Sequence, residues 1–96
     1  MLNQNAMLSR YVEKHEVWKR LGAALRRERE ACGLTVREIE CRSGVAFRTM
    51  YAYERAENSG GIDLKKLAAL CAVIGCDLCD LLAEAMREET ENEQKT

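Results

Sequence analysis

The chain has 96 residues, a net charge of −1, 47% hydrophobic residues, 5% aromatic residues and no proline. A chain of this length forms one domain with a modest core, and the composition favours a small helical protein packed with Leu, Ala, Val and Cys. No apolar run approaches the length of a membrane span, and the first residues lack the pattern of a signal peptide. We therefore expect a cytoplasmic protein with no membrane partner.

The charge is unevenly distributed along the chain. Residues 1–55 carry eleven Lys and Arg against seven Asp and Glu, a net charge of +4, whereas residues 56–96 carry four against nine, a net charge of −5. A chain with such a dipole can bind a polyanion through its basic end. The overall charge therefore does not exclude nucleic-acid binding.

Residues 1–20 predict an N-terminal helical extension. Apolar and small residues recur there at alternating three- and four-residue steps, which is typical of a helical stripe. The stripe comprises Leu8, Tyr11, His15, Trp18, Gly22 and Leu25. It can pack on the domain or against a second copy of the chain. The helical pattern continues through 21–31 and ends near Gly33, and the pattern leaves open whether 8–31 forms one helix or two.

Residues 33–54 predict two short helices joined by a tight turn. Thr35 is the expected N-cap of a helix over 36–42, with Glu38 as the other half of a capping box. Gly44 supplies the positive φ that a sharp turn needs. A second helix follows over 46–54, and the residues expected to face inward are Val45, just before it, and Met50 and Tyr53 within it. Those expected to face outward are Phe47, Arg48, Tyr51 and Ala52. Such an exposed strip indicates a docking surface, and the DNA major groove is the clearest candidate.

The rest of the chain predicts a loop, two helices and a tail. The loop spans 55–61 and is rich in turn-forming residues. Helices are expected over 63–74, which ends at Gly75, and over 77–86. The charged tail 87–96 has no hydrophobic anchor, so we expect it to be disordered. No strand pattern occurs.

Four stretches of the chain, in this order, resemble the phage-repressor-like helix-turn-helix domains, the Cro/C1 or XRE family. The motifs are LGAALRRERE-ACGLT (21–35), REIE-CRSGVA (37–46), YERAE (53–57) and DLKKLAALCAVIGCDLCDLL (63–82), the last of which covers two helices. The resemblance covers about two-thirds of the chain. It implies an all-α, five-helix lambda-repressor-like domain over 21–86, preceded by the extension 1–20.

The resemblance implies that 46–54 is a recognition helix. Arg48 is the expected base reader, because a guanidinium can bond guanine O6 and N7 together. Phe47 and Ala52 are expected to contact thymine methyl groups, and Thr49 or Tyr51 to reach a base or a phosphate.

The resemblance also assigns supporting roles. DNA phosphates would be held by the start of the second helix and by the following loop, with help from helix N-termini. The residues expected in this role are Thr35, Arg37, Arg55, Asn58 and Ser59. Arg29 and Glu54 are expected to form a partly buried ion pair that ties the first helix to the recognition helix.

The chain departs from the family pattern in two places. Val36 stands where a phosphate-binding Gln is usual, with Arg37 beside it, and the loop has Gly60 and Gly61 in place of the usual Pro. These departures are compatible with a family member whose DNA binding is altered or lost.

The five cysteines are compatible with a metal-binding or redox-active site. Cys71, Cys76 and Cys79 have spacings that can begin a zinc or iron–sulfur site. The resemblance instead gives Cys71 a small buried position and Cys76 a buried aliphatic one, where free Cys acts as a small hydrophobe. Cys32 and Cys41 are expected to be more exposed. We expect no bound metal and no cofactor.

The sequence thus predicts a transcriptional regulator, most simply a repressor, that binds double-stranded DNA as a homodimer at a pseudo-palindromic operator. One alternative is an antitoxin or anti-regulator that binds a protein partner through the N-terminal helix. Another is a cysteine-based metal or redox sensor. The sequence holds no phosphate-binding loop and no nucleophile–base pair, so we expect no enzymatic activity.

Overall fold

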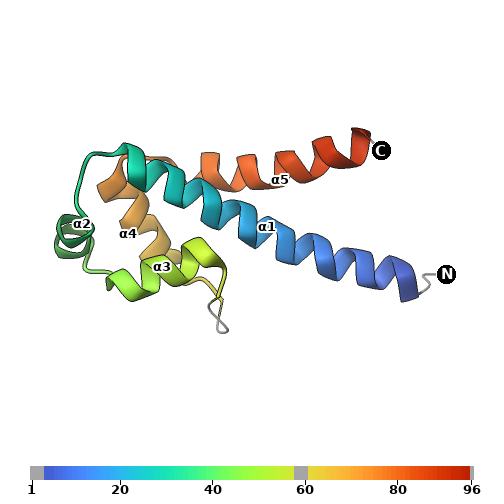
Figure 1. The fold of residues 1–96 in the computed structure, drawn as a ribbon, viewed down its shortest axis with the longest axis horizontal. Coiled ribbons are helices and arrows are strands. Elements are labelled where there is room, and N and C mark those ends of the chain that lie inside the picture. The colour runs from blue at the N-terminus through green and yellow to red at the C-terminus, as the bar shows by residue number, and fades with distance from the viewer. Residues whose placement is uncertain (1–3, 58–60, 96) are drawn as a thin grey trace.

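The computed structural model describes the backbone of residues 4–57 and 61–95 and the side chains of 16–57 and 61–87. Within these ranges the chain is all-helical, with no strand, as the sequence predicts (Figure 1). The five helices are α1 (Gln4–Ala31), α2 (Val36–Ser43), α3 (Phe47–Arg55), α4 (Leu64–Ile74) and α5 (Leu78–Lys95). None of the helices, over the residues described, combines the length and apolar character needed to cross a bilayer.

The ends of α2 follow the predicted cap chemistry. The Thr35 hydroxyl accepts a hydrogen bond from the Glu38 backbone N–H at 3.1 Å, and the Thr35 N–H donates to Glu38 Oε1 at 3.3 Å. Gly44 ends the helix with φ 74°, and its N–H donates to the Glu40 carbonyl. This left-handed residue turns the chain toward α3 within three residues.

The lengths of α1 and α5 bear on two features of the sequence analysis. The boundary between residues 20 and 21 falls inside α1, which is one 28-residue helix. The tail over 87–96, predicted to be disordered, continues α5 as far as Lys95. This part of the chain is rich in Glu, with Arg, Gln and Lys, which are good helix formers even where no apolar face requires a helix.

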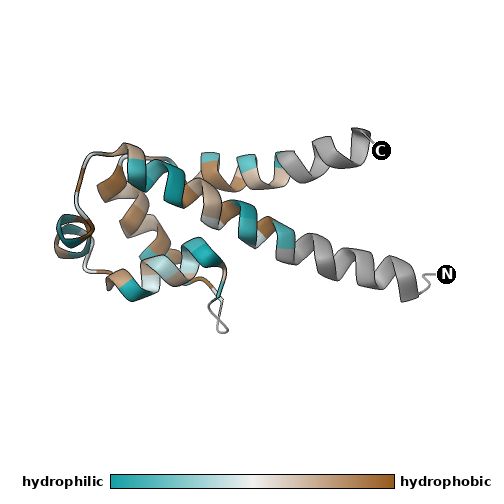
Figure 2. Ribbon diagram, viewed as in Figure 1, coloured by the Kyte–Doolittle hydropathy of each residue, from teal (hydrophilic) through white to brown (hydrophobic). Residues whose placement is uncertain are grey.

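The buried residues among the described side chains form one core cluster. Figure 2 shows the apolar stretches of the helices that contribute to it in brown. The residues of this core come from all five helices and from the turn before α3. They are Leu21, Ala24, Leu25, Ile39, Val45, Met50, Tyr53, Leu67, Leu70, Cys71, Ile74, Leu81 and Ala85. The inward positions predicted for α3 and its turn are therefore confirmed.

Gly22 brings α1 into direct backbone contact with α3. A Cβ at this position would lie 2.4 Å from the Glu54 carbonyl oxygen and 2.5 Å from that of Tyr53. Because backbone atoms cannot move aside as a flexible side chain can, only glycine permits this approach. The contact fixes the C-terminal end of α3 against α1.

Tyr53 also connects α3 to the start of α4. Its ring is buried in the core, and its hydroxyl accepts a hydrogen bond from the Asp63 backbone N–H at 3.1 Å. Asp63 is itself the N-cap of α4, where its carboxylate accepts from the Lys66 N–H at 3.0 Å. The start of α4 is thereby held against α3.

Candidate nucleic-acid interface

The outward face of α3 carries the five predicted base-reading residues, but it does not expose them equally. Phe47 is 42% exposed, and Arg48 beside it is also exposed. Thr49, Tyr51 and Ala52 are half-buried. The most accessible part of the face is thus the N-terminal turn of α3, where Phe47 and Arg48 lie.

Tyr51 is at the centre of an aromatic and cationic cluster. The ring centroids of Phe47 and Tyr51 are 6.0 Å apart with a 79° interplanar angle, an edge-to-face contact. The guanidinium carbons of Arg29 and Arg55 lie 5.3 and 5.6 Å from the centroid of the Tyr51 ring. Both distances suit cation–π attraction. The ring of Tyr51 therefore makes its contacts with side chains of α1 and α3.

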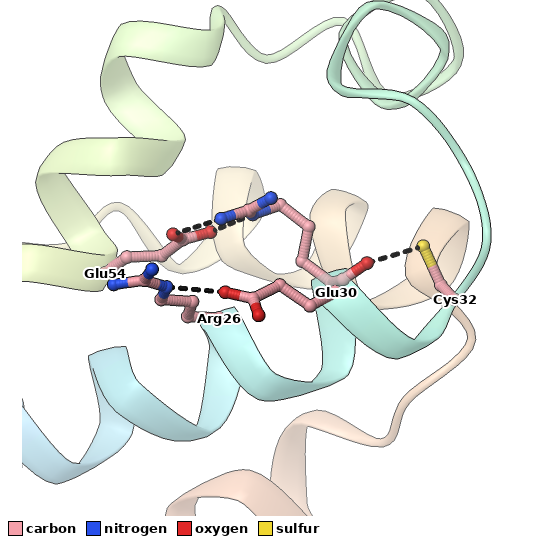
Figure 3. Close-up of polar contacts among 5 residues, drawn as sticks. Arg26, Glu30, Cys32 and Glu54 are labelled. Atoms are coloured by element: carbon pink, nitrogen blue, oxygen red, sulfur yellow. Dashed lines mark hydrogen bonds and ion pairs between the residues drawn. The ribbon is translucent and has the colours of Figure 1, made fainter.

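The ion pair between Arg29 and Glu54 joins α1 to α3. Arg29 donates through Nε to Glu54 Oε2 at 2.6 Å and through Nη2 to Oε1 at 2.9 Å. The hydrogen bond to Glu54 raises the pKa of Arg29 above its ordinary value. Figure 3 shows a second pair, Arg26–Glu30, which lies along α1 beside Glu54. The Cys32 thiol, also drawn there, donates to the Arg29 carbonyl at 3.1 Å. The pairing that the family resemblance implies is present.

The structure describes three of the five residues predicted to contact DNA phosphates, namely Thr35, Arg37 and Arg55. Arg37 and Arg55 are exposed, and Arg37 forms no ion pair with any residue whose side chain is described. The Thr35 hydroxyl is occupied by the capping box. Asn58 and Ser59 lie outside the described residues. Arginine side chains thus provide the accessible cationic groups near α2 and α3.

Glu40 is a residue at this face that the sequence analysis missed. It projects from α2, and its Oε2 accepts a hydrogen bond from the Phe47 N–H at 2.8 Å. Ala46, the N-cap of α3, has no side chain able to make this bond. The sequence shows that Ala46 has no capping side chain. It does not indicate that Glu40 on α2 bonds the first turn of α3.

The cysteines are mostly packing residues. Cys71 is buried and Cys76 is half-buried against the core, whereas Cys41 and Cys79 are exposed. Cys32 is half-buried, which corrects the expectation that it is exposed like Cys41, because it packs against the core beside the end of α1. Burial raises the pKa of Cys71 to about 12 and raises that of Cys76. Across the side chains described, no three His, Cys, Asp or Glu residues gather in a way that would hold a metal ion.

Comparison with known proteins does not assign the chain to a family. No family model matches the chain, and no curated protein matches it significantly. The resemblance to phage-repressor-like domains therefore rests on the sequence motifs alone and stays a prediction.

Proposed function

We propose that this chain is a DNA-binding transcriptional regulator of the phage-repressor-like helix-turn-helix type, acting in the cytoplasm. The observation that carries the proposal is the α2–turn–α3 unit. Its exposed Phe47 and Arg48 lie in the first turn of a helix whose C-terminal end is fixed to α1 by Gly22 and by the Arg29–Glu54 pair. A rigidly held helix with an exposed first turn suits insertion into the major groove.

In this proposal α3 enters the major groove with its N-terminal turn toward the base edges. Arg48 bonds a guanine through O6 and N7, and Phe47 contacts a thymine methyl group. Arg37 and Arg55 contact phosphates, which set the register of the protein on the duplex without reading sequence. Tyr51 holds Arg55 beside the face through the cation–π contact.

The proposed regulator acts as a homodimer. Two copies of α3 would read a pseudo-palindromic operator whose half-sites are separated by one helical turn, ~34 Å. Repression follows if an occupied operator blocks RNA polymerase.

The test is selection from a random duplex library, followed by fluorescence anisotropy of the enriched duplex at two salt concentrations. We expect a palindromic motif to be enriched. The affinity of the protein for the enriched duplex should fall steeply as the salt concentration rises, because phosphate contacts release counterions. Failure of any duplex to be enriched at low salt would contradict the proposal.

Two arginine variants separate base reading from phosphate binding. Arg48→Ala should cost about 1–3 kcal/mol of binding free energy on the selected duplex and relax the preference at one base pair. Arg55→Ala should weaken binding to all sequences alike. Equal, uniform losses in both variants would show that the assigned roles are wrong.

Trp18 favours a second candidate function, binding of a protein partner as an antitoxin or anti-regulator. This residue lies on α1 beyond the contact with α3 and is 47% exposed, although tryptophan side chains are on average highly buried. The test is co-expression with the products of adjacent genes, followed by size-exclusion chromatography with light scattering. Trp18→Ala should weaken such a complex and leave a DNA complex intact. A complex unaffected by this substitution would exclude the surface around Trp18.

A further inference from the structure

The first turn of α3 is capped by a carboxylate from another helix. Glu40 on α2 reaches across the turn to accept the Phe47 N–H at 2.8 Å, and it is half-buried. A helix N-terminus carries a partial positive charge and unpaired N–H groups, which stabilise an anion placed there. In this chain that anion is supplied from within the protein.

This contact has a consequence for DNA binding because it lies beside the exposed Phe47 and Arg48. A helix N-terminus is otherwise a favourable place for a phosphate. With the Glu40 carboxylate on the Phe47 N–H, a DNA phosphate meets an occupied donor and a negative charge. The N-terminal turn is thus well suited to uncharged base edges and poorly suited to the DNA backbone.

We propose that Glu40 determines specificity in DNA binding, by positioning the first turn of α3 and by excluding phosphates from it. This inference rests on the proposed function. Non-specific complexes depend on phosphate contacts, so the carboxylate weakens them most. In the specific complex the same turn faces base edges inside the groove, farther from the phosphates, and the penalty is smaller.

Glu40→Gln is the informative variant, because its amide oxygen can still accept the Phe47 N–H while the charge is lost. We expect random-sequence duplex to bind about threefold to tenfold more tightly at low salt, since one repulsive charge near several phosphates is removed. The selected duplex should gain about twofold or less, so the ratio of specific to non-specific affinity falls. Both gains should shrink as salt rises.

Two further variants separate charge from position. Asp80→Asn makes the same change in net charge on α5 and should leave the affinity ratio unchanged. Glu40→Ala removes the acceptor as well as the charge, so amide hydrogen exchange at Phe47 should become faster than in the wild type and in Glu40→Gln. Its affinity for the selected duplex should fall, because the first turn of α3 loses its cap.

The outcomes distinguish this inference from the proposed function. If selection yields a motif but Glu40→Gln leaves the affinity ratio unchanged, or if Asp80→Asn changes it equally, the role of Glu40 is overturned and the regulator stands. Unchanged exchange at Phe47 in Glu40→Ala would overturn the positioning role. If neither the wild type nor Glu40→Gln enriches any duplex, both the regulator and the inference fail.

Discussion

Two arginines on α1, only two residues apart, form bidentate ion pairs on different sides of the helix. Arg29 pairs with Glu54 of α3 at 2.6 and 2.9 Å, and Arg27 pairs with Glu84 of α5 at 2.6 and 2.8 Å. Both pairs make two short hydrogen bonds, Arg29 through Nε and Nη2 and Arg27 through Nη1 and Nη2, but their surroundings differ. The side chains of Arg29 and Glu54 are 15% and 4% exposed, whereas those of Arg27 and Glu84 are 54% and 34% exposed.

The difference shows that the number and length of the hydrogen bonds do not alone decide what an ion pair contributes to stability. Water and salt screen the exposed Arg27–Glu84 pair, so breaking it leaves two groups that solvent can accommodate. The Glu54 carboxylate, in contrast, is nearly removed from water, and the loss of Arg29 would leave it uncompensated. The α1–α3 contact is therefore the sensitive one, and it supports the face with Phe47 and Arg48.

The largest expected effect is that of Arg29→Ala. It should lower the free energy of unfolding by about 3 kcal/mol, because the Glu54 charge stays buried without its partner. Urea unfolding followed by circular dichroism measures this value. Arg27→Ala is the matched control and should have a clearly smaller effect. Equal losses in the two variants would remove the distinction between the two contacts.

Gly22→Ala tests the same α1–α3 contact through packing. Its Cβ would meet two backbone oxygens at 2.4 and 2.5 Å, so the helices must move apart. We expect a loss of about 2 kcal/mol in unfolding free energy, together with weaker DNA binding if α3 is displaced. Ala23→Gly, at the adjacent exposed position, is the control and should cost only about 1 kcal/mol through helix propensity. An unchanged melting temperature for Gly22→Ala would contradict the close approach.

The smallest effect should come from the α1–α5 pair, and it should depend on pH. The hydrogen bond from Arg27 lowers the pKa of Glu84 below its ordinary value. A lowered folded-state pKa stabilises the fold above the unfolded-state pKa of a glutamate, and this stabilisation is lost as the pH falls through the lowered value. Glu84→Gln should therefore be less stable than the wild type near neutral pH and should approach it in acid. Urea titrations at about pH 7 and about pH 3 measure the two differences. A difference independent of pH would show that the charge of Glu84 contributes nothing.

Local signals predicted most of the fold. The capping box at Thr35, the left-handed Gly44 and the inward spacing of Met50 and Tyr53 depend on neighbours within one or two turns, and all are found in the structure. The Arg29–Glu54 pair spans 25 positions in the sequence, and only the family resemblance indicated it.

What the sequence did not reveal depends on contacts between elements. The cap by Glu40 crosses a turn, and the cation–π contact between Arg29 and Tyr51 joins α1 to α3. Neither has a local spacing that specifies it. The disorder predicted for 87–96 relied on the absence of an apolar anchor and gave too little weight to helix propensity, since α5 extends to Lys95.

The hydrogen bond between Tyr53 and Asp63 bears on how this protein can change in evolution. Both ends of the connection from α3 to α4 are held by α3 itself, since the Glu57 N–H donates to the Ala52 carbonyl at 2.9 Å and the Asp63 N–H donates to the Tyr53 hydroxyl at 3.1 Å. Doubling the length of a connection with fixed ends costs only about 0.6 kcal/mol in closure entropy. This connection is therefore a place where insertions can accumulate at little cost to stability, and where new sequence would arise beside the C-terminal end of α3.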